Sequence, residues 1–72
     1  MSFQAYLDNV ESKTGKSADE LKSIAISKGL VNEDGLAAGV KPAAIIDWLK
    51  SDFDLGHGHA MSIVAYIKGK RS

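Results

Sequence analysis

The sequence predicts an all-α fold, a compact bundle of four short helices whose last two form a helical hairpin around a Gly-x-Gly turn. Two observations carry this prediction. Apolar residues recur at the spacing of an amphipathic helix in four segments, and residues that start or stop helices stand at the ends of these segments. Because a chain of 72 residues has room for only one core, residues 1–72 are expected to form a single domain.

The first helix is expected over residues 3–14. Its apolar stripe, at positions i, i+3, i+4 and i+7, comprises Phe3, Tyr6, Leu7 and Val10. Ser2 is placed to cap its first turn. Gly15 is placed to end it in the left-handed conformation that glycine adopts without strain.

The second helix is expected over residues 17–28, because its start has the pattern of a capping box. In that arrangement the Ser17 hydroxyl accepts from the Glu20 amide, and the Glu20 carboxylate accepts from the Ser17 amide. Gly29 marks the end of this helix. The segment that follows, residues 30–41, contains Asn32 and several glycines and is expected to be a loop with at most one helical turn, over residues 35–38.

The third helix is expected over residues 42–53. Pro42 suits the first helical position, where its fixed φ is favourable and its missing N–H is no loss. This helix has the broadest apolar face in the chain, formed by Ile45, Ile46, Trp48, Leu49 and Phe53. We therefore expect it to lie centrally, with Trp48 as the largest single contributor to the core.

The fourth helix is expected over residues 59–68, after a short turn that contains Gly56 and Gly58. Its apolar residues at helical spacing are Ala60, Ile63, Val64 and Ile67. The basic tail after Gly69 is expected to fray.

Composition limits the kinds of partner. Nine basic and nine acidic residues cancel, so no overall field draws the protein towards nucleic acid or an anionic membrane. Cysteine is absent, which excludes disulfides, thiolate metal sites and cysteine nucleophiles. The sequence has no secretion signal and no apolar run near the about 18 residues of a membrane span. A soluble, cytoplasmic protein that does not associate with membranes is expected.

Several strings along the chain are similar to those of a known family. They are Ser2-Phe3-Gln4-Ala5-Tyr6-Leu7, Lys13-Thr14-Gly15-Lys16, Asp47-Trp48-Leu49-Lys50 and Leu55-Gly56-His57-Gly58-His59-Ala60-Met61. Through them, and over nearly its whole length, the chain resembles the bacterial family of the domain of unknown function DUF4287. The resemblance implies a compact helical bacterial module. Since the family has no assigned activity, it implies no substrate, cofactor or catalytic residue.

The segment 52–59 gathers two acids, both histidines and two glycines, and is the place where we expect a site if the domain has one. Three interpretations are open. In the structural interpretation, which is favoured because glycines in turns are commonly structural, Gly56 and Gly58 supply a positive φ or a close approach. In the same interpretation His57 and His59 cap the last helix or pack against its neighbour.

The second interpretation is phosphate or nucleic-acid binding by the backbone amides of the Gly56–His59 hairpin. Lys68, Lys70 and Arg71 of the basic tail would assist. The carboxylates of Asp52 and Asp54 argue against it, because they put negative charge where an anion would dock.

The third interpretation is weak metal binding at His57 and His59, helped by Asp54, with Asp52 as a further candidate ligand. No separate segment offers a third histidine, and structural zinc normally takes four protein ligands. No metal site and no cofactor are therefore expected.

Catalytic residues are not expected either. Ser62 lies one helical turn from His59, but a pair at this spacing on a short helix supplies no oxyanion hole. A phosphate-binding loop and a dinucleotide fingerprint are both absent from the sequence.

The sequence thus favours a non-enzymatic binding or interaction module whose partner is another protein or an appended domain, with Gly56 to Met61 as the contact segment. Most apolar residues are needed in the core, and Met61 and Tyr66 are the best candidates for exposure. The candidate binding residues are Gly56, His57, Gly58, His59, Lys68, Lys70 and Arg71.

Overall fold

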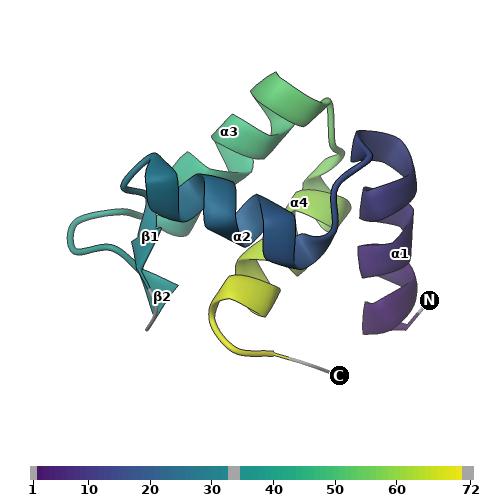
Figure 1. The fold of residues 1–72 in the computed structure, drawn as a ribbon, viewed down its shortest axis with the longest axis horizontal. Coiled ribbons are helices and arrows are strands. Elements are labelled where there is room, and N and C mark those ends of the chain that lie inside the picture. Colours follow the sequence, from purple (N-terminus) through teal and green to yellow (C-terminus); the bar gives the residue numbers. More distant parts are fainter. Residues whose placement is uncertain (1, 33–34, 71–72) are drawn as a thin grey trace.

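The structure, a computed structural model, describes residues 2–32 and 35–70 (Figure 1). Within these residues the chain forms α1 (Phe3–Thr14), α2 (Ala18–Ser27), β1 (Val31–Asn32), β2 (Gly35–Leu36), α3 (Pro42–Phe53) and α4 (His57–Ile67). The predicted helical architecture is therefore confirmed in its main feature. The two strands are an addition to it.

The strand pair replaces part of the expected loop. The strands are antiparallel, with Val31 opposite Leu36 and Asn32 opposite Gly35. The expected helical turn over residues 35–38 is wrong, because Gly35 has a φ of 133°, which no helix contains. Val31 is buried in the core and Leu36 packs against it, so both strands are attached to the core.

The ends of α1 and α2 follow the predicted caps. The Ser2 hydroxyl accepts from the Ala5 amide at 3.2 Å. Gly15 has a φ of 74°, and its amide donates to the Glu11 carbonyl at 2.8 Å. Ser17 and Glu20 form both hydrogen bonds of the capping box. These caps explain why the bounds of both helices lie within one residue of those predicted.

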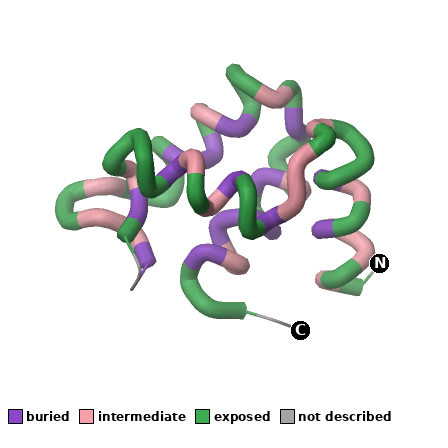
Figure 2. The backbone as a smooth tube through the Cα atoms, viewed as in Figure 1, coloured by how far each residue is buried: buried purple, intermediate pink, exposed green. Residues whose placement is uncertain are grey.

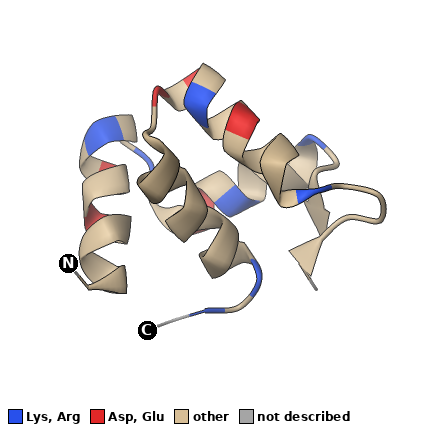
Figure 3. Ribbon diagram, turned by 180° about the vertical axis from the view of Figure 1, so that it is seen from behind, with Lys and Arg blue, Asp and Glu red and all other residues tan. Residues whose placement is uncertain are grey.

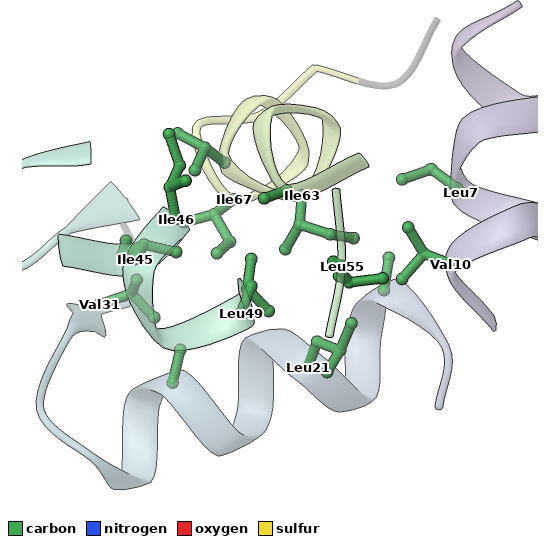
Figure 4. Packing of buried hydrophobic residues seen from close by; sticks show 14 residues of the cluster. Leu7, Val10, Leu21, Val31, Ile45, Ile46, Leu49, Leu55, Ile63 and Ile67 are labelled. Carbon is green, nitrogen blue, oxygen red and sulfur yellow. The ribbon is translucent and has the colours of Figure 1, made fainter. Parts of the chain in front are cut away.

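The centre of the bundle is α4, which contacts each of the other three helices (Figure 1). The expectation that α3 would be central is wrong. Five residues of α4 are buried, namely Ala60, Ser62, Ile63, Val64 and Ile67, whereas α3 buries Ile45, Ile46 and Leu49. Ile63 and Ile67 meet Leu49 of α3 in the middle of the core (Figure 4). Because α4 is contacted from three sides, it needs the wider buried surface.

Trp48 is half-buried and is not the largest part of the core. Its ring stands edge-on to the Phe53 ring, with centroids 5.7 Å apart. The largest fully buried side chains are Leu21, Ile45, Leu49, Ile63 and Val10. With successive residues about 100° apart around a helix, position 48 lies at the margin of the face that Ile45 and Leu49 bury. The indole is therefore directed to the rim of the bundle.

Buried and exposed residues alternate along each helix (Figure 2). This is the pattern of helices that pack on one side and face water on the other. None of the helices in the described residues has the length and apolar character that a bilayer crossing requires.

Candidate functional site

The turn between α3 and α4 consists of Asp54, Leu55 and Gly56. Asp54 ends α3 in the left-handed conformation, with a φ of 55°, and its amide donates to the Leu49 carbonyl. Leu55 is buried and fixes the turn to the core. Gly56 then acts as the N-cap of α4, with a φ of −71°.

The two glycines of this turn do not have the role that the structural interpretation gave them. Gly56 has an extended backbone, and Gly58 lies inside α4, so neither needs a positive φ. A Cβ at Gly58 would lie 3.9 Å from the Tyr6 ring, which is an ordinary contact, and a Cβ at Gly56 would meet open space. The left-handed residue of the turn is Asp54 instead.

The first turn of α4 has open backbone amides. Gly56 offers no side chain to cap them, and the turn contains no acidic residue. Amides at a helix start have no partner within the helix and carry the positive end of its dipole. Gly56, His57 and Gly58 are all exposed, so this end of α4 is accessible from solvent.

The two histidines have different surroundings. His57 is exposed, whereas His59 is half-buried with its ring edge-on to Tyr6 of α1, at a centroid distance of 5.3 Å. The Nε2 atom of His59 is buried and has no hydrogen-bond partner among the described residues. The packing interpretation therefore fits His59 but not His57.

Metal binding finds little support in this arrangement. Helical residues two apart differ by about 200° around the axis, so the side chains of His57 and His59 leave α4 on different sides. The part of the chain that the structure describes has no group of three or more His, Cys, Asp or Glu residues that could hold a metal ion.

The predicted binding residues are divided between the two ends of α4. Gly56, His57, Gly58 and His59 lie at its start, and Lys68 and Lys70 follow its end. The 11 residues of α4 separate these groups by about 16 Å. The Lys70 ammonium lies over the Phe3 ring, 5.4 Å from its centroid. Arg71 lies outside the described residues.

One side of α4 is both exposed and uncharged. No residue between His57 and Ile67 is Asp, Glu, Lys or Arg, and Figure 3 shows the helix without a charged position between α1 and α3. The solvent side is formed by His57, Gly58, Met61 and Ala65, which we call the exposed α4 face. Met61 is 45% exposed there, and the exposure expected for it is confirmed.

Ala65 extends the contact segment beyond the predicted Gly56 to Met61. It is half-buried, and its spacing of four residues from Met61 was the signal for it in the sequence. Tyr66, the other residue expected to be exposed, is half-buried, and its hydroxyl donates to the Asp19 carboxylate.

A depression of about 200 Å³ lies elsewhere, between α1, the start of α2 and Tyr66. Three carboxylates line it, those of Asp8, Glu11 and Asp19. None of the predicted binding residues does so. Sequence reasoning missed it because its acids come from two separate helices, neither of which is unusual by itself.

The match to known proteins rests on one comparison. No curated protein and no solved structure matches the chain. The family model of the domain of unknown function DUF4287 matches residues 2–69, which includes all four helices and the turn between α3 and α4. The resemblance carried by the short strings is thereby confirmed, and the chain belongs to the DUF4287 family.

Proposed function

We propose that this domain is a non-enzymatic protein-interaction module that binds its partner through the exposed α4 face. One observation carries the proposal: the central helix has no charged residue, yet turns one side to solvent with Met61 45% exposed in its middle. Protein interfaces are depleted of charged residues in their cores and enriched in methionine, whose flexible side chain adapts to a partner.

A comparison with the other large apolar side chain that is exposed among the described residues supports this choice. Ile26 on α2 is 43% exposed, but its neighbours along α2 are Lys22, Ser23 and Ser27, which are polar. A single exposed apolar residue among polar ones is normal for a soluble surface. Met61 differs because Gly58 and Ala65, on the same side of α4, have no polar side-chain group.

The contacts of Ser62 and His59 support a role without catalysis. The Ser62 hydroxyl donates to the His59 backbone carbonyl at 2.6 Å and not to the imidazole. The His59 ring packs on Tyr6. A nucleophile needs a base within hydrogen-bond reach, and this pair does not provide one.

The proposal includes a cytoplasmic location, with which the absence of cysteine agrees.

The charge distribution favours protein over nucleic acid as the partner. Asp54 stands directly before the open amides of α4, where a phosphate would dock. Lys68 and Lys70 lie at the opposite end of the helix, so they cannot offset that carboxylate.

The proposal can be tested by photo-crosslinking in the native host cells. A benzophenone amino acid replaces Met61 in one variant and Ile26 in the matched control, since the two side chains are equally exposed. We expect a defined protein adduct from position 61 and none from position 26. A further change, Ala65→Glu, should remove the adduct because it puts a charge into the exposed α4 face.

Circular dichroism verifies that each variant is folded. Equal crosslinking from both positions, or an adduct that persists in the Ala65→Glu background, would show that the proposed surface is not the one used.

A further inference from the structure

We infer that the partner on the exposed α4 face is a second copy of this chain, bound with its α4 antiparallel to the first about a two-fold axis at Met61. This inference rests on the proposed function, since it names the occupant of the same surface. The order of charges and small residues along α4 and at its two ends supports it.

The charges at the two ends of the helix have opposite signs. Asp54 is exposed and stands just before α4, and Lys68 is exposed and stands just after it. Asp54 precedes Met61 by seven residues (61 − 54), and Lys68 follows Met61 by seven (68 − 61). The uncharged helix between them therefore has an acid at one end and a base at the same sequence distance on the other side.

Small residues flank Met61 on the same face. Gly58 precedes Met61 by three residues and Ala65 follows it by four. If two copies pair antiparallel with Met61 at the axis, position 65 of one copy faces position 57 of the other, so the small Ala65 lies opposite His57, with Gly58 one residue away. The absence of a Cβ at Gly58 and the single methyl group of Ala65 let the two backbones approach closely, and the two Met61 thioethers fill the space at the axis.

Charge complementarity selects this arrangement over the parallel one. In the antiparallel pair Asp54 of each copy faces Lys68 of the other. In a parallel pair Asp54 would face Asp54 and Lys68 would face Lys68, which is unfavourable. The antiparallel arrangement is isologous, with the same patch used by both copies, as in most symmetric dimers.

Two further properties of the chain determine how strongly two copies would associate. The nine basic and nine acidic residues give no net charge, so two copies do not repel each other as whole molecules. The face is only one helix wide, below the roughly 1,000 Å² of buried surface expected of a stable interface. A weak, reversible dimer is therefore the expected species.

Sedimentation equilibrium of the whole chain tests this inference through charge exchange. We expect the wild type to dimerise with a Kd below about 1 mM. Asp54→Lys and Lys68→Asp should each raise the Kd about tenfold or more, because like charges then face each other at both ends of the contact. An equimolar mixture of these two variants should restore dimerisation, since the mixed dimer has opposite charges at both ends.

Matched variants separate this effect from changes in net charge or folding. Lys41→Asp changes the net charge by the same amount as Lys68→Asp but lies at the start of α3, outside the exposed α4 face, and should leave the Kd unchanged. Asp54→Asn removes the charge with a residue that also tolerates the left-handed conformation, and should weaken the dimer less than Asp54→Lys does.

The outcomes separate the inference from the proposed function. A wild-type chain that is monomeric at about 1 mM, a concentration that detects even weak contacts, overturns the inference, as does a mixture of the two charge variants that fails to dimerise. If the Met61 adduct in cells then contains a different protein, the proposed function stands with another occupant. If no adduct forms at all, both are overturned.

Discussion

The two turns that join neighbouring helices, residues 15–17 between α1 and α2 and residues 54–56 between α3 and α4, have the same length but opposite designs. In the first, side chains satisfy the polar backbone. The Thr14 hydroxyl donates to the Val10 carbonyl at 2.8 Å and accepts from the Lys16 amide at 3.1 Å. The capping box of Ser17 closes the start of α2.

The second turn has no such side-chain closure. Asp54 is held in a left-handed conformation that glycine would adopt with less strain, and Gly56 leaves the start of α4 without a side-chain cap. The buried Leu55 fixes it to the core, and the backbone amides of Asp54 and Leu55 donate to the Leu49 carbonyl. The comparison shows that side-chain hydrogen bonds stabilise the first turn. The second turn lacks them, and it leaves backbone groups and one side of α4 accessible.

Among the variants that test this comparison, Gly15→Ala is expected to have the largest effect on the free energy of unfolding. Because Gly15 has a φ of 74°, a side chain there should lower the free energy of unfolding by about 1.5 kcal/mol. The same substitution at Gly58, inside α4 and in ordinary contact distance of Tyr6, should raise it by about 0.5 kcal/mol. Urea unfolding at low protein concentration measures both. Equal signs at the two positions would contradict the conclusion that the first turn requires the left-handed conformation of Gly15.

Ser17→Ala should lower the free energy of unfolding by about 1 kcal/mol, because it removes the hydroxyl that accepts from the Glu20 amide. Thermal unfolding followed by circular dichroism gives the difference. Ser12→Ala, an exposed position within α1, is the control and should be close to neutral. If Ser17→Ala and Ser12→Ala change the free energy of unfolding equally, side-chain capping does not stabilise the first turn.

The smallest effect is expected from Gly56→Ser, which supplies the missing cap. It should raise the free energy of unfolding by about 0.3 kcal/mol. Gly56→Ala is the matched control, because the space around Gly56 is open but a methyl group cannot accept a hydrogen bond. Urea unfolding of the two variants in parallel isolates the hydroxyl. If Gly56→Ser is no more stable than Gly56→Ala, the backbone amides at the start of α4 already have other hydrogen-bond partners.

The parts of the fold that the sequence predicted well are those with local chemical signals. Pro42 and the Ser17 box mark the starts of α3 and α2, and these starts lie within one residue of prediction. The start of α4 was placed at residue 59 but lies at His57, because Gly56 caps by backbone shape alone and Gly58 suggested that the turn continued. The strands escaped prediction because two residues are too few for alternation to be recognised.

The parts that depend on packing between helices were harder to predict. Trp48 has the size of a core residue, but its place around α3 directs it to the rim. The segment around His57 and Met61 was identified from its composition, whereas its continuation to Ala65 follows from the helix that connects them. That Lys68 and Lys70 lie at the opposite end of α4 from the hairpin was also learned only from the structure, because residue types do not show which residues are close together in space.

The central position of α4 has a consequence for the order of events during synthesis. Residues 57–67 leave the ribosome after the other three helices, yet they contribute the surface against which α1, α2 and α3 all pack. Until α4 emerges, Leu7, Leu21 and Leu49 have no common core to enter. The core can therefore be completed only after the last helix has been translated, and until then the apolar faces of the earlier helices lack the surface that covers them.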